Sequence, residues 1–308
     1  MSGVEPHKRT LDSYLNYGVV AINKPCGPSS HQVTGWVRNI VGLKKAGHFG
    51  TLDPEVSGVL PIALGNATKL ARYFMREDKE YVCIMRFHKD ISESELKKLF
   101  SAFIGKIKQI PPIRSAVSRR EREREIYNIE FIEMEGRDVL FKISCEAGTY
   151  IRKLCYDLGK KAGIGAHMLE LRRIRAGPFF EKNSFLLQEL SDAVWLAHER
   201  NDESEIRKII LPIEDVLPFK KVWIYDSAVD AICNGAQLKK PGIVRNEEFK
   251  KGEKIAIMTL KNELVAVAEA ILDSEELKKI EKGQVCKTER VVMQSGVYPR
   301  LWGEKKGI

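Results

Sequence analysis

The chain has 308 residues, enough for two domains with separate cores, and its 44% hydrophobic content excludes disorder for most of it. Its 51 basic and 42 acidic residues give a formal net charge of +9, which favours a polyanionic partner. Six scattered cysteines without a C-x-x-C pair exclude zinc-finger spacing and a disulfide framework, and the lack of a long apolar run predicts a soluble, intracellular protein.

The first predicted elements alternate between strands and helices. Residues 1–17 are polar and are expected to form a tail or a strand used by another element. Residues 18–22 predict a short buried strand. Ser30 is expected to cap a helix with an apolar face that ends at Gly42, and a second helix is predicted over 66–74.

A loop that presents a carboxylate follows the first predicted helix. Residues 46–54 read A-G-H-F-G-T-L-D-P, and the glycines allow backbone angles that are closed to other residues. Pro54 biases Asp53 toward an extended conformation, in which its carboxylate can approach a substrate closely. An ordinary Asp-Pro turn with a solvated side chain gives the same pattern, so the loop alone leaves both interpretations open.

The next elements lead to a fixed arginine. Strands are predicted over 81–87 and 139–145, with a helix over 94–103 between them. Thr149 is expected to cap a helix whose apolar residues recur at i, i+3, i+4 and i+7, which leaves Arg152 in the first turn free to point elsewhere. Residues 150–178 hold seven basic and two acidic residues, a composition suited to phosphate contacts.

An arginine-rich segment lies between these elements. Residues 110–117 contain Pro-Pro and Arg114 and lead into an Arg/Glu run that ends at Glu125. One interpretation is a solvated, self-paired charge run. The other is an RNA-contacting loop. Beyond Pro218 the composition changes to short strands, including 254–260 and 263–272, which predict a small β-barrel.

Four segments in one order carry a family resemblance. They are N-K-P-C-G-P-S-S at 23–30, G-T-L-D-P at 50–54, K-E-Y at 79–81 and G-T-Y-I-R at 148–152. Together they resemble the TruB-type pseudouridine synthases, and most of all the archaeal and eukaryotic box H/ACA (dyskerin-like) branch. The likeness runs from about Tyr17 to Trp302.

This resemblance implies an α+β fold, with a mixed, largely antiparallel pseudouridine synthase catalytic domain and a small β-barrel PUA domain that binds RNA. It divides the chain into an N-terminal extension (1–17), the catalytic domain (18–217), the PUA domain (218–296) and a C-terminal tail (297–308). It also implies that the Pro-Pro segment begins a thumb-like loop that clamps RNA, although Ser118 stands where a lysine is common. The candidate RNA contacts are Arg114, Arg119, Arg120, Arg172 and Arg173.

The implied chemistry is the isomerisation of uridine. The N1–C1′ bond breaks, the uracil turns and C5 joins C1′, so no cofactor or metal is needed. Asp53 is the implied catalytic aspartate, which either attacks the sugar or takes its C2′ proton; the sequence leaves both open. Arg152 is expected to pair with Asp53 and favour its ionised form. Tyr81 is expected to stack on the extruded uracil with its hydroxyl near C5.

Four further residues are predicted to bind substrate. Tyr150 and Leu171 would form apolar walls that exclude water. His48 would wedge into the RNA stack, although a lone histidine is more often a structural hydrogen-bonding residue. Lys24 would support the loop or a phosphate. Base flipping is expected, because the target atoms are buried in a stacked base.

Three functions stay open. The first is the catalytic subunit of a box H/ACA ribonucleoprotein acting on ribosomal RNA and on position 55 of tRNA. Its implied partners are a guide RNA and three small proteins, one zinc-ribbon-like, one a β-barrel and one a kink-turn binder. The others are a stand-alone tRNA pseudouridine synthase and a non-catalytic RNA-binding scaffold. The compact C-terminal tail favours an archaeal, cytoplasmic protein.

Overall fold

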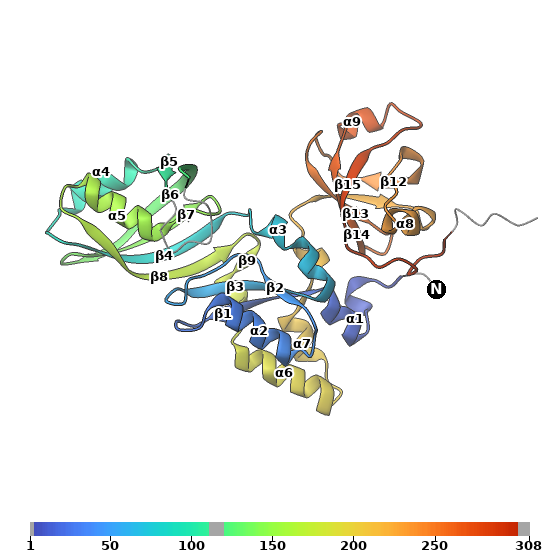
Figure 1. Ribbon diagram of the computed structural model, residues 1–308, viewed down its shortest axis with the longest axis horizontal. Coiled ribbons are helices and arrows are strands. Elements are labelled where there is room, and N and C mark those ends of the chain that lie inside the picture. Colours follow the sequence, from blue (N-terminus) through green and yellow to red (C-terminus); the bar gives the residue numbers. More distant parts are fainter. Residues whose placement is uncertain (1–2, 111–119, 301–308) are drawn as a thin grey trace, which may run out of the picture.

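The computed structural model describes residues 3–110 and 120–300 (Figure 1). Within these residues the largest element is a ten-stranded sheet. Its strands are β1 (Gly18–Lys24), β2 (Ala46–His48), β3 (Ser57–Leu64), β4 (Lys79–Phe87), β5 (Gly105–Gln109), β6 (Arg122–Glu135), β7 (Asp138–Cys145), β8 (Ala166–Ala176), β9 (Phe179–Phe180) and β10 (Leu211–Pro212). The order is β10-β1-β3-β8-β4-β7-β6-β5, with β2 beside β3 and β9 beside β8. Only the β3–β8 pairing is parallel among these described strands.

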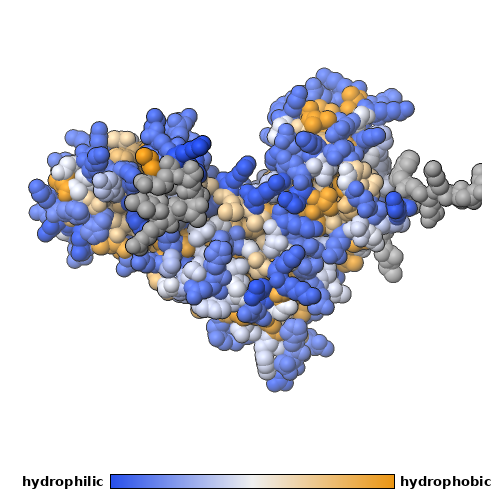
Figure 2. All heavy atoms as spheres, viewed as in Figure 1, coloured by the Kyte–Doolittle hydropathy of each residue, from blue (hydrophilic) through white to orange (hydrophobic). Residues whose placement is uncertain are grey.

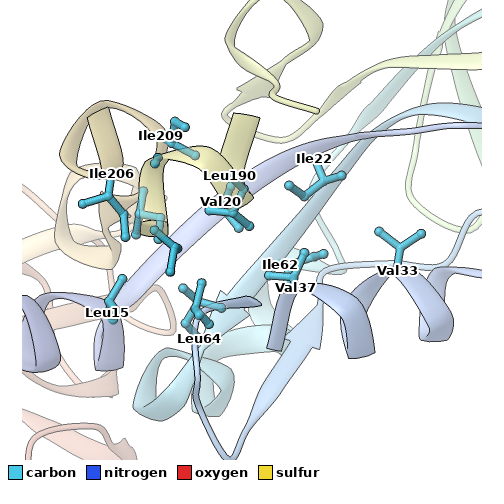
Figure 3. Packing of buried hydrophobic residues seen from close by; sticks show 14 of the residues in the cluster. Leu15, Val20, Ile22, Val33, Val37, Ile62, Leu64, Leu190, Ile206 and Ile209 are labelled. Carbon is cyan, nitrogen blue, oxygen red and sulfur yellow. The ribbon is translucent and has the colours of Figure 1, made fainter. Parts of the chain in front are cut away.

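The helices cover this sheet in two groups. They are α1 (Leu11–Asn16), α2 (Ser30–Ile40), α3 (Ala71–Phe74), α4 (Glu93–Ser101), α5 (Ile151–Lys161), α6 (Leu187–Glu199) and α7 (Ser204–Ile209). One core lies between β1, β3 and the helices α2, α6 and α7, and Figure 3 shows its packing. A second core lies between α4, α5 and the strands β4, β6, β7 and β8. Tyr81 and Leu171 pack against both cores, so these two residues mark the seam between them.

A second sheet forms the C-terminal part of the described chain. Its strands run in the order β12-β11-β13-β14-β15, and α8 and α9 pack with them around a separate core. The bounds are β11 (Lys220–Ile224), α8 (Asp226–Cys233), β12 (Ile243–Asn246), β13 (Lys254–Met258), β14 (Leu264–Ala270), α9 (Ser274–Leu277) and β15 (Cys286–Val291). Figure 2 shows a hollow, bordered by hydrophilic residues, between this sheet and the lobe that contains β4 to β8.

The two sheets share an apolar contact. Alternate residues of β1 point to opposite faces, so Val20 belongs to the first core while Val19 packs toward the second sheet. There it joins a cluster that includes Trp223 of β11 and Leu264 of β14. The fold class predicted from the sequence is confirmed: the chain is α+β, with a mixed, largely antiparallel large sheet and a small β domain.

Three predicted elements need correction. Residues 3–17, the described part of the predicted tail or strand, instead contain a 3-10 turn at Pro6–Lys8 followed by α1. Ser29, not Ser30, caps α2, since its hydroxyl accepts from the N–H of Gln32. Residues 66–74 divide into a 3-10 helix, Gly65–Leu70, and the short α3.

The cap of α5 also differs. Tyr150 is the N-cap residue, and the hydroxyl of Thr149 donates instead to the carbonyl of Glu146. β6, which no predicted element covers, runs from Arg122 to Glu135 and pairs with β7.

The charge run belongs largely to a hairpin. β6 begins at Arg122 and pairs with β5, and exposed ion pairs join Lys106 to Glu123 and Lys108 to Glu121. For these residues the self-paired interpretation fits the structure. The predicted contacts Arg114 and Arg119 lie outside the described residues. In the part of the chain that the structure describes, no helix is long and apolar enough to cross a membrane.

Candidate active site

Asp53 lies in the loop between β2 and β3, and its neighbours in this loop are held by their main chain. Lys24, at the end of β1, is fully buried, and its Nζ donates to the carbonyl of Pro54 at 3.1 Å. The N–H of Gly27 donates to the same carbonyl at 2.9 Å. Burial lowers the pKa of Lys24. These contacts place Lys24 under the loop, where it cannot reach a phosphate at the surface.

A buried serine holds the other side of Asp53. The Oγ of Ser30 donates to the carbonyl of Leu52 and accepts from the N–H of Leu52, both at 2.8 Å. The N–H of Val56 closes the turn by donating to the carbonyl of Asp53 at 3.0 Å. Because the main chain is fixed on both sides, the carboxylate of Asp53 has a defined direction. The segment 23–30 therefore supplies hydrogen-bonding groups that hold the Asp53 loop in place.

The carboxylate of Asp53 meets Arg152, as the sequence predicts. Nη2 of Arg152 donates to Oδ2 of Asp53 at 2.9 Å, and the carboxylate of Glu55 lies 3.9 Å from the same nitrogen. The side chains of Arg152 and Asp53 are 50% and 56% exposed. An ion pair this open to water adds only about 0–1 kcal/mol to stability. Its consequence here is orientation of a carboxylate that stays accessible to solvent.

Arg152 owes its place to the start of α5. The apolar stripe of this helix is buried as predicted. The side-chain amide of Gln109, which is almost fully buried, accepts from the N–H of Tyr150 at 3.0 Å and donates to its carbonyl at 3.1 Å. These two hydrogen bonds to the main chain fix Tyr150. Through Tyr150 they also fix the first turn of α5, which carries Arg152. No sequence pattern predicts this role of Gln109.

Tyr81 lies on β4 between β7 and β8, where Arg173 is its cross-strand partner. Its side chain is half-buried, and burial raises the pKa of Tyr81, while a hydrogen bond with Arg173 and the charge of that guanidinium lower it. The charge of Asp53 also raises the pKa of Tyr81. Leu171 lies opposite Cys83 on the neighbouring strand, beside the seam that Tyr81 occupies.

His48 is half-buried on β2, and its ring meets that of His31 edge-on at 5.1 Å. Burial lowers the pKa of His48, and its Nδ1 is buried with no hydrogen-bond partner among the described residues. The alternative role as a structural hydrogen-bonding residue therefore has no support at this nitrogen. Arg120 is exposed, as a residue that contacts RNA must be.

Two arginines of β8 need separate descriptions. Arg172 forms an ion pair with Glu181 and donates to Ser57 Oγ at 3.1 Å and to Asn23 Oδ1 at 3.0 Å, so protein groups occupy its guanidinium. Arg173 is only 1% exposed. The prediction that Arg173 contacts RNA is wrong, because its side chain points into the protein.

Within residues 3–110 and 120–300, no three histidine, cysteine, aspartate or glutamate side chains converge as a ligand set. What the site offers is an accessible carboxylate on a fixed loop, a guanidinium that orients it and a half-buried phenol. An accessible, oriented carboxylate can act as a nucleophile or as a base.

Comparisons with known proteins place family models along most of the chain. The N-terminal domain of the TruB family of pseudouridylate synthases matches residues 38–151, and a tRNA pseudouridylate synthase B C-terminal domain matches 152–218. A PUA domain matches 220–292, and a DKCLD domain matches 1–34.

Relatives match over nearly the whole length. Proteins named probable tRNA pseudouridine synthase B from Nanoarchaeum equitans and Archaeoglobus fulgidus are each 49% identical over 302 residues, 97% of this chain and 86% and 93% of theirs. A chain in the crystal structure of a Cbf5-Nop10-Gar1 complex is 46% identical with a TM-score of 0.90, covering 97% of this chain and 92% of that one. A chain in an H/ACA RNP bound to a substrate RNA containing 2′-deoxyuridine is 44% identical with a TM-score of 0.89, covering 98% and 93%.

Proposed function

Because this chain belongs to the TruB family of pseudouridine synthases, we propose that it is the catalytic subunit of a box H/ACA guide ribonucleoprotein that isomerises uridine in ribosomal RNA. The observation that carries the proposal is the Asp53–Arg152 pair, which is mounted on a fixed loop and open to solvent. It lies in a chain that matches the chains of H/ACA assemblies over 97% and 98% of its length.

Each residue of the site has a separate role in the isomerisation of uridine. The target uridine leaves its stack, at a cost of a few kcal/mol, and enters the site. The carboxylate of Asp53 faces the ribose, either as a nucleophile at C1′ or as a base at C2′, and Arg152 holds its direction. The N1–C1′ bond breaks, the base turns and C5 joins C1′. The hydroxyl of Tyr81 relays the C5 proton to solvent by giving up its own proton as it takes the one from C5. N1 keeps the electron pair of the broken N1–C1′ bond and takes a proton from solvent in exchange. Tyr150 and Leu171 limit the access of water.

The C-terminal domain supplies a second RNA contact in this proposal. A pocket of about 420 Å³ lies beside α8 in the C-terminal domain. It combines small residues, which admit a close approach, with polar side chains, and its lining includes Ser227, Asp230, Asn234, Gly235, Ala236 and Arg300. A shared apolar cluster joins this domain to the large sheet. In the proposal, an RNA held at the pocket presents one uridine to Asp53.

Partners and compartment complete the proposal. The structural neighbours are chains from assemblies with Nop10, Gar1 and H/ACA RNA. We extend this to a guide RNA and small partner proteins, of zinc-ribbon-like, β-barrel and kink-turn-binding type, for this chain. An archaeal source and a cytoplasmic location belong to the same proposal. The relatives' names favour a second candidate, a stand-alone tRNA pseudouridine synthase.

Reconstitution distinguishes these two functions. The purified chain is incubated with target ribosomal RNA fragments, with and without an H/ACA guide and the small partners, and pseudouridine is mapped at each position. We expect conversion at the guided uridine to exceed that of the chain alone by at least about tenfold, because the guide presents the unpaired base. A mismatched guide is the control. Equal conversion without any guide would contradict the guided function and favour the stand-alone one.

A further inference from the structure

Arg173 is a buried cation without an ionic partner in the described chain. Its side chain is 1% exposed, and no carboxylate among the described residues forms an ion pair with it. Burial lowers the pKa of Arg173, and its charge lowers the pKa of a second buried cation, Lys79; atoms of both side chains lie about 4 Å from the position of a Cβ at Gly50. Burying an unpaired charge is costly, and an apolar residue at this position would avoid the cost. Stability alone therefore does not explain the arginine.

The contacts of Arg173 lead to both sides of the active site. Its Nη2 donates to the carbonyl of Gly50 at 3.2 Å and its Nη1 to that of Thr51 at 3.5 Å, in the segment that leads into Asp53. Its Nε donates to the carbonyl of Val59 at 2.8 Å, beyond the loop. Tyr81 is the cross-strand partner of Arg173 on β4, and the charge of the guanidinium lowers the pKa of Tyr81.

The main chain is shaped for this contact. Gly58 on β3 pairs with Arg173 on β8, and a Cβ at Gly58 would lie 2.2 Å from the carbonyl oxygen of Arg173. The φ angle of Gly58, +105°, is also one that side chains disfavour. Only glycine lets the strand after the loop approach Arg173 so closely. The planar, five-donor guanidinium can then span groups that a lysine ammonium cannot reach together.

We propose that Arg173 is the positioning residue that sets the placement of Asp53 relative to Tyr81. Its guanidinium ties together the main chain on both sides of the Asp53 loop, and Arg173 itself is the strand partner of Tyr81. The inference rests on the proposed function for its kinetic consequence. Arg173 itself does not touch the substrate, because its side chain is enclosed by protein.

The test uses Arg173→Lys, which keeps the charge and loses the fork, and Arg173→Met, which loses both. We expect the single-turnover rate of isomerisation in the assembled particle to fall about 100-fold for Arg173→Lys and further for Arg173→Met, the scale of a misplaced reacting group. The dissociation constant for RNA should change less than about twofold. Arg175→Met is the matched control, since Arg175 lies on the same strand and pairs with Glu80; its rate should stay within about twofold.

A double substitution separates positioning from general loss of structure. If Arg173 acts through Tyr81, then Arg173→Lys should cost clearly less in a Tyr81→Phe chain than in the wild type. If Arg173→Lys lowers the rate by the same factor in the Tyr81→Phe chain as in the wild type, the inference is overturned. A wild-type rate for Arg173→Lys would also overturn it.

Hydrogen exchange provides a readout that needs no activity. The N–H of Leu52 donates to Ser30 Oγ and that of Val56 donates to the carbonyl of Asp53, and both should exchange at least about tenfold faster in Arg173→Lys. Unchanged protection at both amides would overturn the inference even if the wild-type chain proved inactive. An inactive wild type with increased exchange in the variant would contradict the proposed function alone.

Discussion

Replacing Asp53 with asparagine should lower isomerisation at least about 10³-fold, to below detection in most assays, because the amide can act neither as a nucleophile nor as a base. The substitution keeps the size and hydrogen-bonding capacity of the side chain. The loop should also keep its shape, since it is held by the main chain of Leu52 and Pro54. RNA affinity should therefore change less than about twofold. Single-turnover conversion and RNA binding, measured on the same preparation, check both expectations.

Glu55→Gln provides the matched control. Glu55 is 87% exposed and its carboxylate lies 3.9 Å from the same nitrogen of Arg152 that binds Asp53. Glu55→Gln removes one negative charge from the same loop. The substitution therefore reproduces the electrostatic change of Asp53→Asn without altering the proposed catalytic group. We expect a rate within about threefold of the wild type. A comparable loss in both variants would assign the effect to charge near Arg152 and not to Asp53.

Breaking the buried ion pair at the junction of the two sheets should have the largest effect on stability. Arg9 and Glu214 are 6% and 3% exposed, and two hydrogen bonds of 2.7 and 3.1 Å join them. Glu214 also accepts from the N–H of Leu264 in the second sheet at 3.1 Å. Arg9→Met leaves a buried carboxylate without its cation, which costs about 3–5 kcal/mol. Chemical denaturation should report this loss as a lower free energy of unfolding.

The exposed pair Arg86–Asp138 is the control for this experiment. Its side chains are 51% and 32% exposed, so Arg86→Met should cost less than about 1 kcal/mol. The double variant Arg9→Met, Glu214→Leu should recover much of the loss, because it removes both buried charges. A loss below 1 kcal/mol for Arg9→Met would show that the junction does not depend on this pair.

The sequence predicted the main parts of the site because they lie on local patterns. The turn at Asp53 follows from its glycine and proline neighbours, and the position of Arg152 follows from the apolar period of α5. The pairing of the two across 99 residues depended on family resemblance, because no local pattern reports a contact at that separation.

Charge alone puts Arg173 among the predicted RNA contacts, whereas its side chain is buried in the structure. The residues 150–178 were interpreted by their charge, and the strand β8 within them was not predicted. Successive side chains of a strand point to opposite faces, so Arg172 and Arg173 cannot both face RNA. Gln109 and Ser30 were missed as supports because their partners are main-chain groups from distant segments. Nearly every residue has a main-chain N–H and carbonyl, so the sequence does not show which of these groups a distant side chain contacts.

The most direct measurement follows the hydrogen at C5 of the target base. An RNA with tritium at C5 of one guided uridine is mixed with excess assembled particle. Joining C5 to C1′ must release this tritium to water, so we predict one equivalent released per pseudouridine formed, and none for Asp53→Asn. Pseudouridine formation that is unaffected by Asp53→Asn, or tritium release that does not depend on the guide, would contradict the account.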